Sequence, residues 1–235
     1  MGVSLAMGWR QLLFENWPVE PATVDERLPE RLAVDTHDGH AWLSVVPFTN
    51  VDIRPAGVPA RLGLRLPELN LRTYVTCDGE PGVYFFSLDA QGLASVLGAR
   101  VLQHLPYYYA RISLSPHEGR IRFRSRRRHP GDRPAHYDAT YWPTGEPFAA
   151  RDDPRARFLA ERYRLYTEAT DGSLRYTDVD HEPWTLYPAA ADTESNTLFA
   201  ANGFAQPTGE PVRYYSPGLD VIAGQSTRWS EESNE

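Results

Sequence analysis

The chain has 235 residues and a formal net charge of −7. Its length allows one substantial core, and its acidic balance argues against a general nucleic-acid binder, whose electrostatic footprint is usually basic. No apolar run approaches the roughly 18 residues that span a bilayer, so we expect a soluble, cytoplasmic protein. Cys77 is the only cysteine, which excludes an intrachain disulfide and a multi-thiolate metal site.

All 24 basic residues are arginine, and the chain contains no lysine. A Schiff base with a carbonyl substrate needs a side-chain amine that can lose its proton, and a guanidinium group does not lose one in proteins. The composition therefore excludes lysine-based imine catalysis. It also excludes a nucleotide hydrolase that depends on a phosphate-loop lysine.

The elements expected along the chain are mostly strands. Proline brackets a short helix within residues 19–32, and glycine- or proline-rich turns separate the alternating segments that follow. We predict a single mainly β domain of the α+β class, built on an antiparallel sheet and covering residues 1–223, with a polar and disordered tail at 224–235. Strands are expected at 41–48, 68–76, 82–89, 107–114, 119–128, 135–143, 173–189 and 214–222, and further helices at 93–105, 154–163 and 192–203.

The predicted strand over residues 68–76 carries a polar face. Alternate side chains of a strand point to opposite sides, so Glu68, Asn70, Arg72 and Tyr74 share one face while leucine, threonine and valine occupy the other. This face is either simply solvated, as one face of many antiparallel sheets is, or it lines a binding site.

Two other groups of polar residues have an ordinary structural interpretation beside a functional one. Arginines alternate along residues 120–126, and Arg127 and Arg128 extend this stripe. The pattern is typical of a solvated or edge strand, although an anionic partner is the alternative. Asp35, His37, Asp38 and His40 crowd one turn, which needs no metal ion to explain it.

A third group combines Glu161 and Arg162 with His181 and Trp184 of the string HEPW. A histidine near a carboxylate can transfer protons, but a hydrogen-bonded histidine packed against tryptophan is the more common arrangement. No GxSxG, HExxH or GxGxxG motif selects a standard mechanism.

Several strings, taken together and in order, resemble the YqjF-like family of the acetoacetate-decarboxylase-like superfamily. The resemblance covers the chain from about Trp9 to about Ile222 and rests on LLFENWPV, PELNLRTYV, GVYFFSLDA, LPYYYA, FLAERYRLY and HEPW. It implies a conical antiparallel β-barrel with peripheral helices and an internal cavity, and it directs the Glu68 face inward.

The same resemblance places Tyr107 and Tyr108 where decarboxylases of the superfamily carry a lysine pair, and Glu68 where they carry a pocket glutamate. We therefore expect no Schiff-base decarboxylation. Our leading hypothesis is a pocket for a small oxo or carboxylate compound, with Glu68 and Tyr107 as catalytic groups if the protein is an enzyme. The ligand-binding residues would be Asn70, Arg72, Tyr74, Tyr108 and His181.

The rival hypothesis is a ligand-sensing or structural module without turnover, in which Glu68 and Arg72 form a buried salt bridge. Under either hypothesis we expect no cofactor, no metal, and no nucleic-acid or membrane partner. The sequence leaves open whether the protein is a homo-oligomer.

Overall fold

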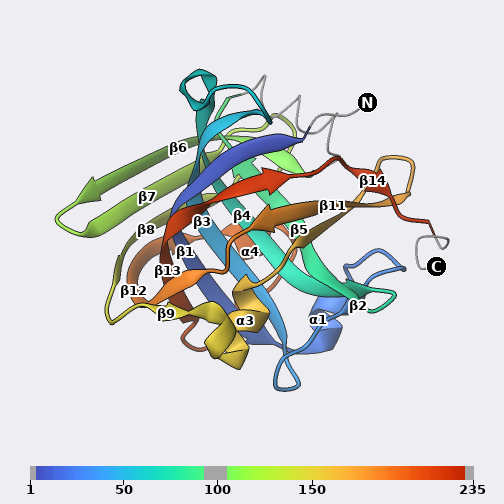
Figure 1. Cartoon of the computed structure of the whole chain (residues 1–235). Coiled ribbons are helices and arrows are strands. Elements are labelled where there is room, and N and C mark those ends of the chain that lie inside the picture. The colour runs from blue at the N-terminus through green and yellow to red at the C-terminus, as the bar shows by residue number, and fades with distance from the viewer. Residues whose placement is uncertain (1–3, 93–104, 231–235) are drawn as a thin grey trace.

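A computed structural model of the chain describes residues 4–92 and 105–230. Strands dominate it, and the few helices are short and lie outside the sheet (Figure 1). The helical segments are α1 (Pro21–Asp25), η1 (Ala60–Leu62), η2 (Ala150–Asp152), α3 (Pro154–Ala160) and α4 (Leu198–Ala201). The strands are β1 (Leu5–Val19), β2 (Ala33–Val34), β3 (Ala41–Pro55), β4 (Leu64–Cys77), β5 (Glu80–Ala90), β6 (Tyr107–His117), β7 (Arg120–Arg127), β8 (His136–Pro143), β9 (Phe148–Ala149), β10 (Arg164–Glu168), β11 (Leu174–His181), β12 (Thr185–Asn196), β13 (Val212–Ala223) and β14 (Thr227–Arg228).

The sheet closes on itself twice because two of its strands have additional partners. The antiparallel wall β13-β1-β3-β4-β5 is continued by β6, β7, β8 and β12, which return to β13 and complete what we call the larger ring. The same wall is also continued by β10 and β11, which return to β13 and complete the smaller ring. Each face of the shared wall therefore looks into a different interior.

The interior of the larger ring is the main hydrophobic core. Leu13, Leu69 and Leu71 of the shared wall pack there against Phe123 and Tyr137 of the outer strands, and all five are buried. Leu69 and Leu71 belong to the face of β4 opposite to Glu68. The apolar half of the alternating β4 pattern is therefore the half that faces the larger ring.

The interior of the smaller ring holds aromatic side chains in two buried clusters. Phe14, Phe48 and Trp184 form one buried cluster within it, and Tyr74 and Leu159 belong to another. Helix α3 contributes Leu159, so the helix covers this face of the wall. Its start is set locally, because Pro154 occupies the first turn and the Asp153 carboxylate accepts a hydrogen bond from the Ala156 amide at 2.7 Å.

Close approach of β1 and β13 depends on one glycine. Gly218 has φ +123°, and a Cβ placed on it would lie 1.9 Å from the carbonyl oxygen of Trp9. Since no side chain fits there, the wall shared by the two rings requires glycine at this position.

Several predicted elements were confirmed and others need correction. The hairpin of β4 and β5 forms as expected, and antiparallel pairing dominates, although β5 pairs in parallel with both β6 and β10. The predicted helix over 192–203 is reduced to α4, because β12 continues to Asn196 and Gly203 then ends the helix with φ +80°. The predicted helix over 93–105 falls almost entirely outside the described residues.

The prediction of a disordered tail at 224–235 is wrong for its first part. Thr227 and Arg228 form β14 on β11, and Trp229 is buried against Tyr166 and Tyr176. The composition of the segment is polar, and this is why the sequence predicts disorder. Its one tryptophan nevertheless packs against aromatic side chains distant in sequence, and this contact orders the segment. The single-domain boundary at residue 223 stays a prediction.

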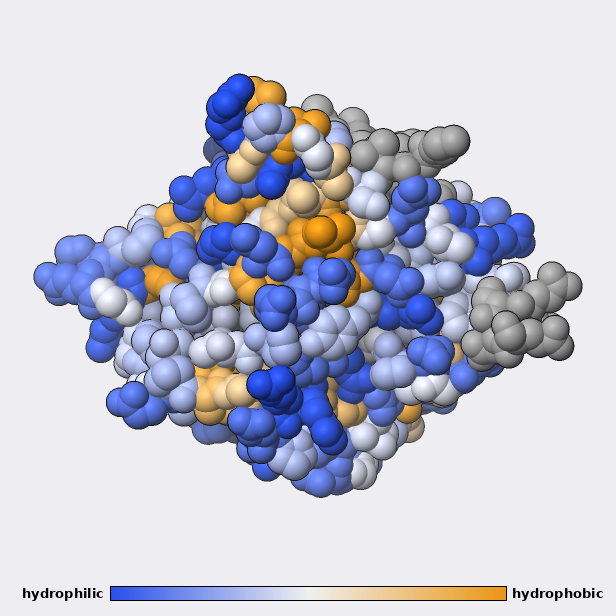
Figure 2. All heavy atoms as spheres, viewed as in Figure 1, coloured by the Kyte–Doolittle hydropathy of each residue, from blue (hydrophilic) through white to orange (hydrophobic). Residues whose placement is uncertain are grey.

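Hydrophilic side chains cover most of the face seen in Figure 2, with an apolar patch near its centre. Within residues 4–92 and 105–230, the large apolar side chains that remain exposed are Leu62, Leu64, Tyr163 and Ile222. None of the described helices has the length and apolar character needed to cross a membrane.

Candidate functional site

The polar face of β4 looks into the smaller ring, as the inward direction implied by the resemblance requires. Register with β3 places Glu68 opposite Phe48 and Arg72 opposite Ser44. Glu68 and Asn70 are buried, with 5% and 3% of their surfaces exposed, and Arg72 is half-buried. The polar face is therefore not a solvated one.

Glu68 is held by two hydrogen-bond donors from other strands. The Tyr107 hydroxyl donates to Glu68 Oε2 at 3.0 Å, and Asn50 Nδ2 donates to the same oxygen at 3.1 Å. The other carboxyl oxygen, Oε1, has no donor among the residues that the structure describes. Both donors from the described residues therefore anchor the same carboxyl oxygen.

Burial raises the pKa of Glu68 from 4.5 to about 7, because the interior solvates a carboxylate poorly. The hydrogen bonds from Tyr107 and Asn50 lower the pKa, and the nearby Asp89 carboxylate raises it. Burial also raises the pKa of Tyr107 well above 10, and Glu68 adds to that shift. At neutral pH the tyrosine is therefore a hydrogen-bond donor, and the glutamate lies near its titration midpoint.

A buried ion pair lies on the opposite face of the strands that carry this site. Asp89 of β5 follows Leu88, and its Oδ1 accepts a bond from Arg127 Nε at 2.7 Å, with 1% and 3% of the two side chains exposed. Despite this partner, burial raises the pKa of Asp89 to about 6. Arg127 also stacks on the Tyr108 ring, with Cζ 4.1 Å from the ring centroid.

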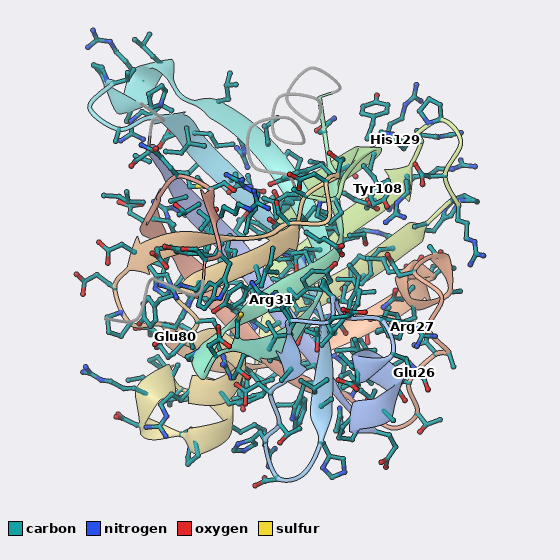
Figure 3. The ribbon with its side chains drawn as sticks, turned by 90° about the vertical axis from the view of Figure 1, so that its right-hand side faces the viewer. Glu26, Arg27, Arg31, Glu80, Tyr108 and His129 are labelled. Atoms are coloured by element: carbon teal, nitrogen blue, oxygen red, sulfur yellow. The ribbon has the colours of Figure 1, made fainter. Side chains whose placement is uncertain are left out.

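Tyr108 consequently does not join Tyr107 in the smaller ring. Register pairs Tyr107 with Leu88 and Tyr108 with Asp89, so the two tyrosines point to opposite faces of β6. Tyr108 meets His129 edge to face at 5.6 Å, and Figure 3 shows these two labelled residues close together. The prediction that both tyrosines line one pocket is wrong, and alternation along the strand is the reason.

Arg72 and Tyr74 attach helix α3 to the wall. The Tyr74 hydroxyl and Arg72 Nη2 both donate to the carbonyl oxygen of Leu159, at 2.9 and 3.0 Å. Tyr74 also lies 2.9 Å from the Ser44 hydroxyl, which donates to Asn16 Oδ1. The two donors satisfy the carbonyl oxygen of Leu159 near the C-terminal end of α3, where the helix itself supplies no hydrogen-bond partner. They therefore fix this short helix to the wall.

The salt bridge between Glu68 and Arg72, on which the structural alternative rested, does not form. Within residues 4–92 and 105–230 no ion pair joins them, because Arg72 is directed to Leu159 and lies over the Phe14 ring, with Cζ 5.4 Å from the centroid. Glu68 instead binds neutral donors. Among the described residues its charge therefore has no direct cationic partner, which agrees with the raised pKa.

His181 lies beside Trp184 in the interior of the smaller ring. The contacts that the structure shows for it hold the local structure together. Its Nδ1 donates to the Glu182 carbonyl at 2.8 Å, and its ring stacks on Tyr163 at 4.5 Å. Glu161 secures the neighbouring turn by accepting the Trp184 amide at 2.9 Å and the Tyr163 hydroxyl at 2.6 Å. His181 also lines a hollow of about 510 Å³ between β1, β3, β11 and β13.

Several buried polar atoms of the smaller ring lack a hydrogen-bond partner among the described residues. A buried polar group without a partner costs free energy, so a group of them points to bound solvent or a ligand. These atoms are Asn50 Oδ1, Asn70 Oδ1, Arg72 Nε, His181 Nε2 and Trp184 Nε1. They supply both donors and acceptors.

The acidic and histidine residues of the first turn serve other purposes. Arg162 Nη1 binds Asp35 Oδ2 at 2.7 Å, and His37 pairs with His40 through the backbone. In the part of the chain that the structure describes, no three His, Cys, Asp or Glu residues are grouped to hold a metal ion.

The fold is similar to that of acetoacetate-decarboxylase-like proteins. The structure superimposes on the enduracididine biosynthesis enzyme MppR complexed with pyruvate, with a TM-score of 0.69, 14% identity, and coverage of 99% of this chain and 92% of that one. It also superimposes on an acetoacetate decarboxylase-like enzyme from Sphingomonas wittichii RW1, with a TM-score of 0.66, 16% identity, and coverage of 97% and 93%.

The family is defined by sequence. Residues 6–220 match the DUF2071 family, described as an uncharacterized conserved protein, and the chain belongs to this family. It is 41% identical over 223 residues to the uncharacterized protein YqjF of Bacillus subtilis (strain 168), across 94% of this chain and 91% of that protein. The expected YqjF-like family and the superfamily fold are thus confirmed.

Sequence reasoning missed three residues of the site region. Asn50 lies on the same face of β3 as Phe48, so alternation continued through the strand predicted to end near Pro47 would have found it. Asp89 and Arg127 form a pair across 38 residues of sequence, and no local pattern indicates their contact.

Proposed function

We propose that the smaller ring binds a small oxo acid and that Glu68 transfers a proton to and from it without a covalent intermediate. The observation that carries the proposal is the buried Glu68 carboxyl, whose pKa is raised to about 7 and whose Oε1 has no donor among the described residues. A general acid or base is most effective when its pKa lies near the working pH.

The unpartnered polar atoms around Glu68 suit the parts of such a compound. Arg72 Nε can donate to a carboxylate, while Asn50 Oδ1 and Asn70 Oδ1 can accept from a hydroxyl group or from water. The structural relative MppR is described in complex with pyruvate, a 2-oxo acid, which supports this class of ligand. The lysine-free composition excludes an imine with a lysine of this chain.

The reaction that these groups support is proton transfer at the carbon next to a carbonyl. Glu68 would take the proton, the electron pair of the broken C–H bond would move toward the carbonyl oxygen, and an enolate would form. A neutral Glu68 accepts hydrogen bonds less strongly, so the Tyr107 hydroxyl could then donate to the enolate oxygen. Return of the proton to carbon restores the starting carboxylate.

Exchange of the pyruvate methyl protons for deuterium in D₂O tests this proposal. We expect the wild type to accelerate the exchange and Glu68→Gln to lose on the order of 100-fold or more of that acceleration. Glu15→Gln is a matched control, because Glu15 is a buried glutamate that also accepts from a tyrosine, Tyr137, at 2.7 Å, but does so in the larger ring.

Binding is measured separately by thermal unfolding with pyruvate and a panel of other oxo acids. A ligand at about 100 times its dissociation constant adds roughly 2.7 kcal/mol to the free energy of unfolding, which shifts the midpoint visibly. If no oxo acid shifts the midpoint and none exchanges, the proposal is wrong. A shift without exchange would leave the protein as a binder of oxo acids and remove the catalytic part.

A further inference from the structure

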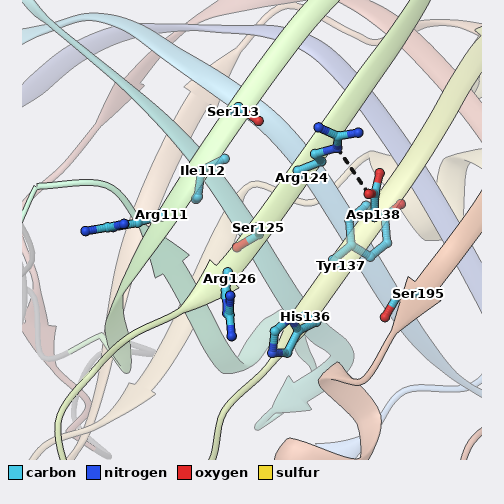
Figure 4. A pocket seen from close by; sticks show the side chains of 10 residues that line it. All are labelled: Arg111, Ile112, Ser113, Arg124, Ser125, Arg126, His136, Tyr137, Asp138 and Ser195. Atoms are coloured by element: carbon cyan, nitrogen blue, oxygen red, sulfur yellow. Dashed lines mark hydrogen bonds and ion pairs between the residues drawn. The ribbon is translucent and has the colours of Figure 1, made fainter.

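The outer face of the larger ring carries a row of three basic residues on neighbouring strands. Antiparallel register places Arg111 of β6 directly opposite Arg126 of β7, and Arg126 directly opposite His136 of β8. All three lie on the solvent side of their strands, where the arginines are exposed and the histidine is half-buried. Figure 4 shows them on three neighbouring strands.

This row lacks the carboxylates that accompany the other arginines of β7. Arg120 pairs with Asp192 at 3.8 Å, Arg122 with Glu194 at 2.9 Å, and Arg124 with Asp138 at 3.1 Å. Among the described residues, neither Arg111 nor Arg126 has an acidic partner within 4.0 Å. The sequence pattern of alternating arginines therefore contains two kinds of residue, and only the tertiary structure separates them.

The expectation of an edge strand does not account for the row. β7 pairs with β6 on one side and with β8 on the other, so it has no free edge to protect. Like charges placed directly opposite each other across strands are destabilising, and this arrangement carries that cost without an internal counter-charge among the described residues.

The same row borders a hollow of about 370 Å³. Among the described residues that line it, Asp138 is the only acidic one, and its carboxylate already binds Arg122 and Arg124. Ser113 and Ser195 also line the hollow and add hydroxyl groups. The free charge of the hollow is therefore positive, although the whole chain carries a net charge of −7.

We propose that this hollow is a binding site for a compact phosphate-bearing small molecule, separate from the Glu68 site. Neighbouring strands are about 4.8 Å apart, so the two guanidinium groups can reach oxygens of one phosphate, with the His136 imidazole beside them. A volume of about 370 Å³ leaves room for a small organic group beyond the phosphate. Nucleic acid fits less well, because it needs an extended basic surface and the adjacent arginines are neutralised.

Calorimetric titration with inorganic phosphate and with glycerol phosphate at low salt tests the proposal. We expect Arg111→Gln and Arg126→Gln each to weaken phosphate binding about tenfold and the double variant to abolish it. Arg120→Gln removes the same charge from the same face of β7 outside the hollow, and we expect it to change binding less than twofold. Glu68→Gln should bind phosphate as the wild type does, since the two sites are separate.

Weaker phosphate binding by these variants would not result from unfolding. Removing one of two opposed arginines relieves repulsion, so it should not lower the unfolding midpoint. Equal weakening by Arg120→Gln would show that phosphate responds only to general charge, and the proposal would be wrong. Absence of phosphate binding to the wild type would also overturn it. A single-stranded oligonucleotide that binds more tightly than glycerol phosphate would replace it with nucleic-acid binding.

Discussion

The Tyr107 hydroxyl lies 3.0 Å from Glu68 Oε2, although β5 lies between the strands that carry the two residues. The contact exists because both side chains point into the smaller ring and the tyrosine is long enough to pass over the intervening strand. It joins Tyr107, which the sequence resemblance places at a lysine position of the superfamily, to the buried glutamate. The geometry around this contact yields four predictions.

Replacing Glu68 with glutamine should stabilise the protein at neutral pH. Between pH 4.5 and about 7 the folded state keeps a proton that the unfolded chain releases, so the free energy of unfolding falls as pH rises through this window. Below the window the carboxyl is protonated in both states and no penalty remains. At pH 8 the variant should exceed the wild type by up to about 3 kcal/mol.

Urea unfolding of both proteins from pH 4 to pH 8 measures this difference. Asp89 contributes a slope of the same sign, with its pKa raised to about 6, but it does so in both proteins and cancels in the comparison. Parallel curves for the wild type and the variant would contradict the raised pKa of Glu68.

Replacing Tyr107 with phenylalanine should raise the pKa of Glu68 above about 7. The tyrosine hydroxyl stabilises the carboxylate form, and phenylalanine keeps the ring while removing that donor. A ¹³C NMR titration of the Glu68 carboxyl carbon measures the shift. Tyr109→Phe removes a hydroxyl two residues farther along β6 that does not bond to Glu68, and an equal shift in that variant would contradict the assignment.

Replacing Arg127 with methionine should destabilise the protein by about 3–5 kcal/mol at neutral pH, because Asp89 is then left as an unpaired buried charge. The loss should shrink as pH falls from 8 toward about 6. Arg127 lowers the pKa of Asp89, so without it the carboxyl takes up its proton at a higher pH than the value of about 6 in the wild type. Denaturant unfolding at pH 5 and pH 8 measures the difference. The double variant with Asp89→Asn should be more stable than Arg127→Met alone, and a loss independent of pH would count against the ion pair.

Removing either donor to the Leu159 carbonyl should loosen helix α3. We expect Arg72→Met and Tyr74→Phe each to cost about 1 kcal/mol, the usual contribution of one hydrogen bond. Hydrogen exchange should show faster exchange of the α3 amides at Arg157 and Glu161, with the strands β6 to β8 unchanged. Uniformly faster exchange over the whole chain would show that Arg72 acts on the sheet rather than on the helix.

Much of this site could be predicted from local pattern. Alternation along residues 68–76 correctly separates Glu68, Asn70 and Arg72 from the apolar side chains, because a strand has a fixed two-residue period. The same rule, applied to β6, would have separated Tyr107 from Tyr108. The family resemblance supplied the inward direction of the polar face, which the period alone leaves open.

The partners of these side chains could not be predicted in the same way. Arg127 reads as the end of a solvated arginine row, yet it is buried on Asp89, whereas Arg126 beside it is exposed. Arg72 could pair with the Glu68 carboxylate four residues away, but it reaches the end of a helix 87 residues later. Trp229 belongs to a polar segment and still packs into an aromatic cluster.

The sequence by itself therefore determined the lysine-free chemistry, the mainly β class, the family and the face on which Glu68 lies. These follow from composition and from the local geometry of strands. Only the tertiary structure decided that the shared wall borders two interiors, that Tyr107 and Asn50 meet at one oxygen of Glu68, and that some arginines are neutralised while Arg111 and Arg126 are not. Those contacts depend on strand register and on closure of the sheet through pairings distant in sequence, and a two-residue period carries no information about either.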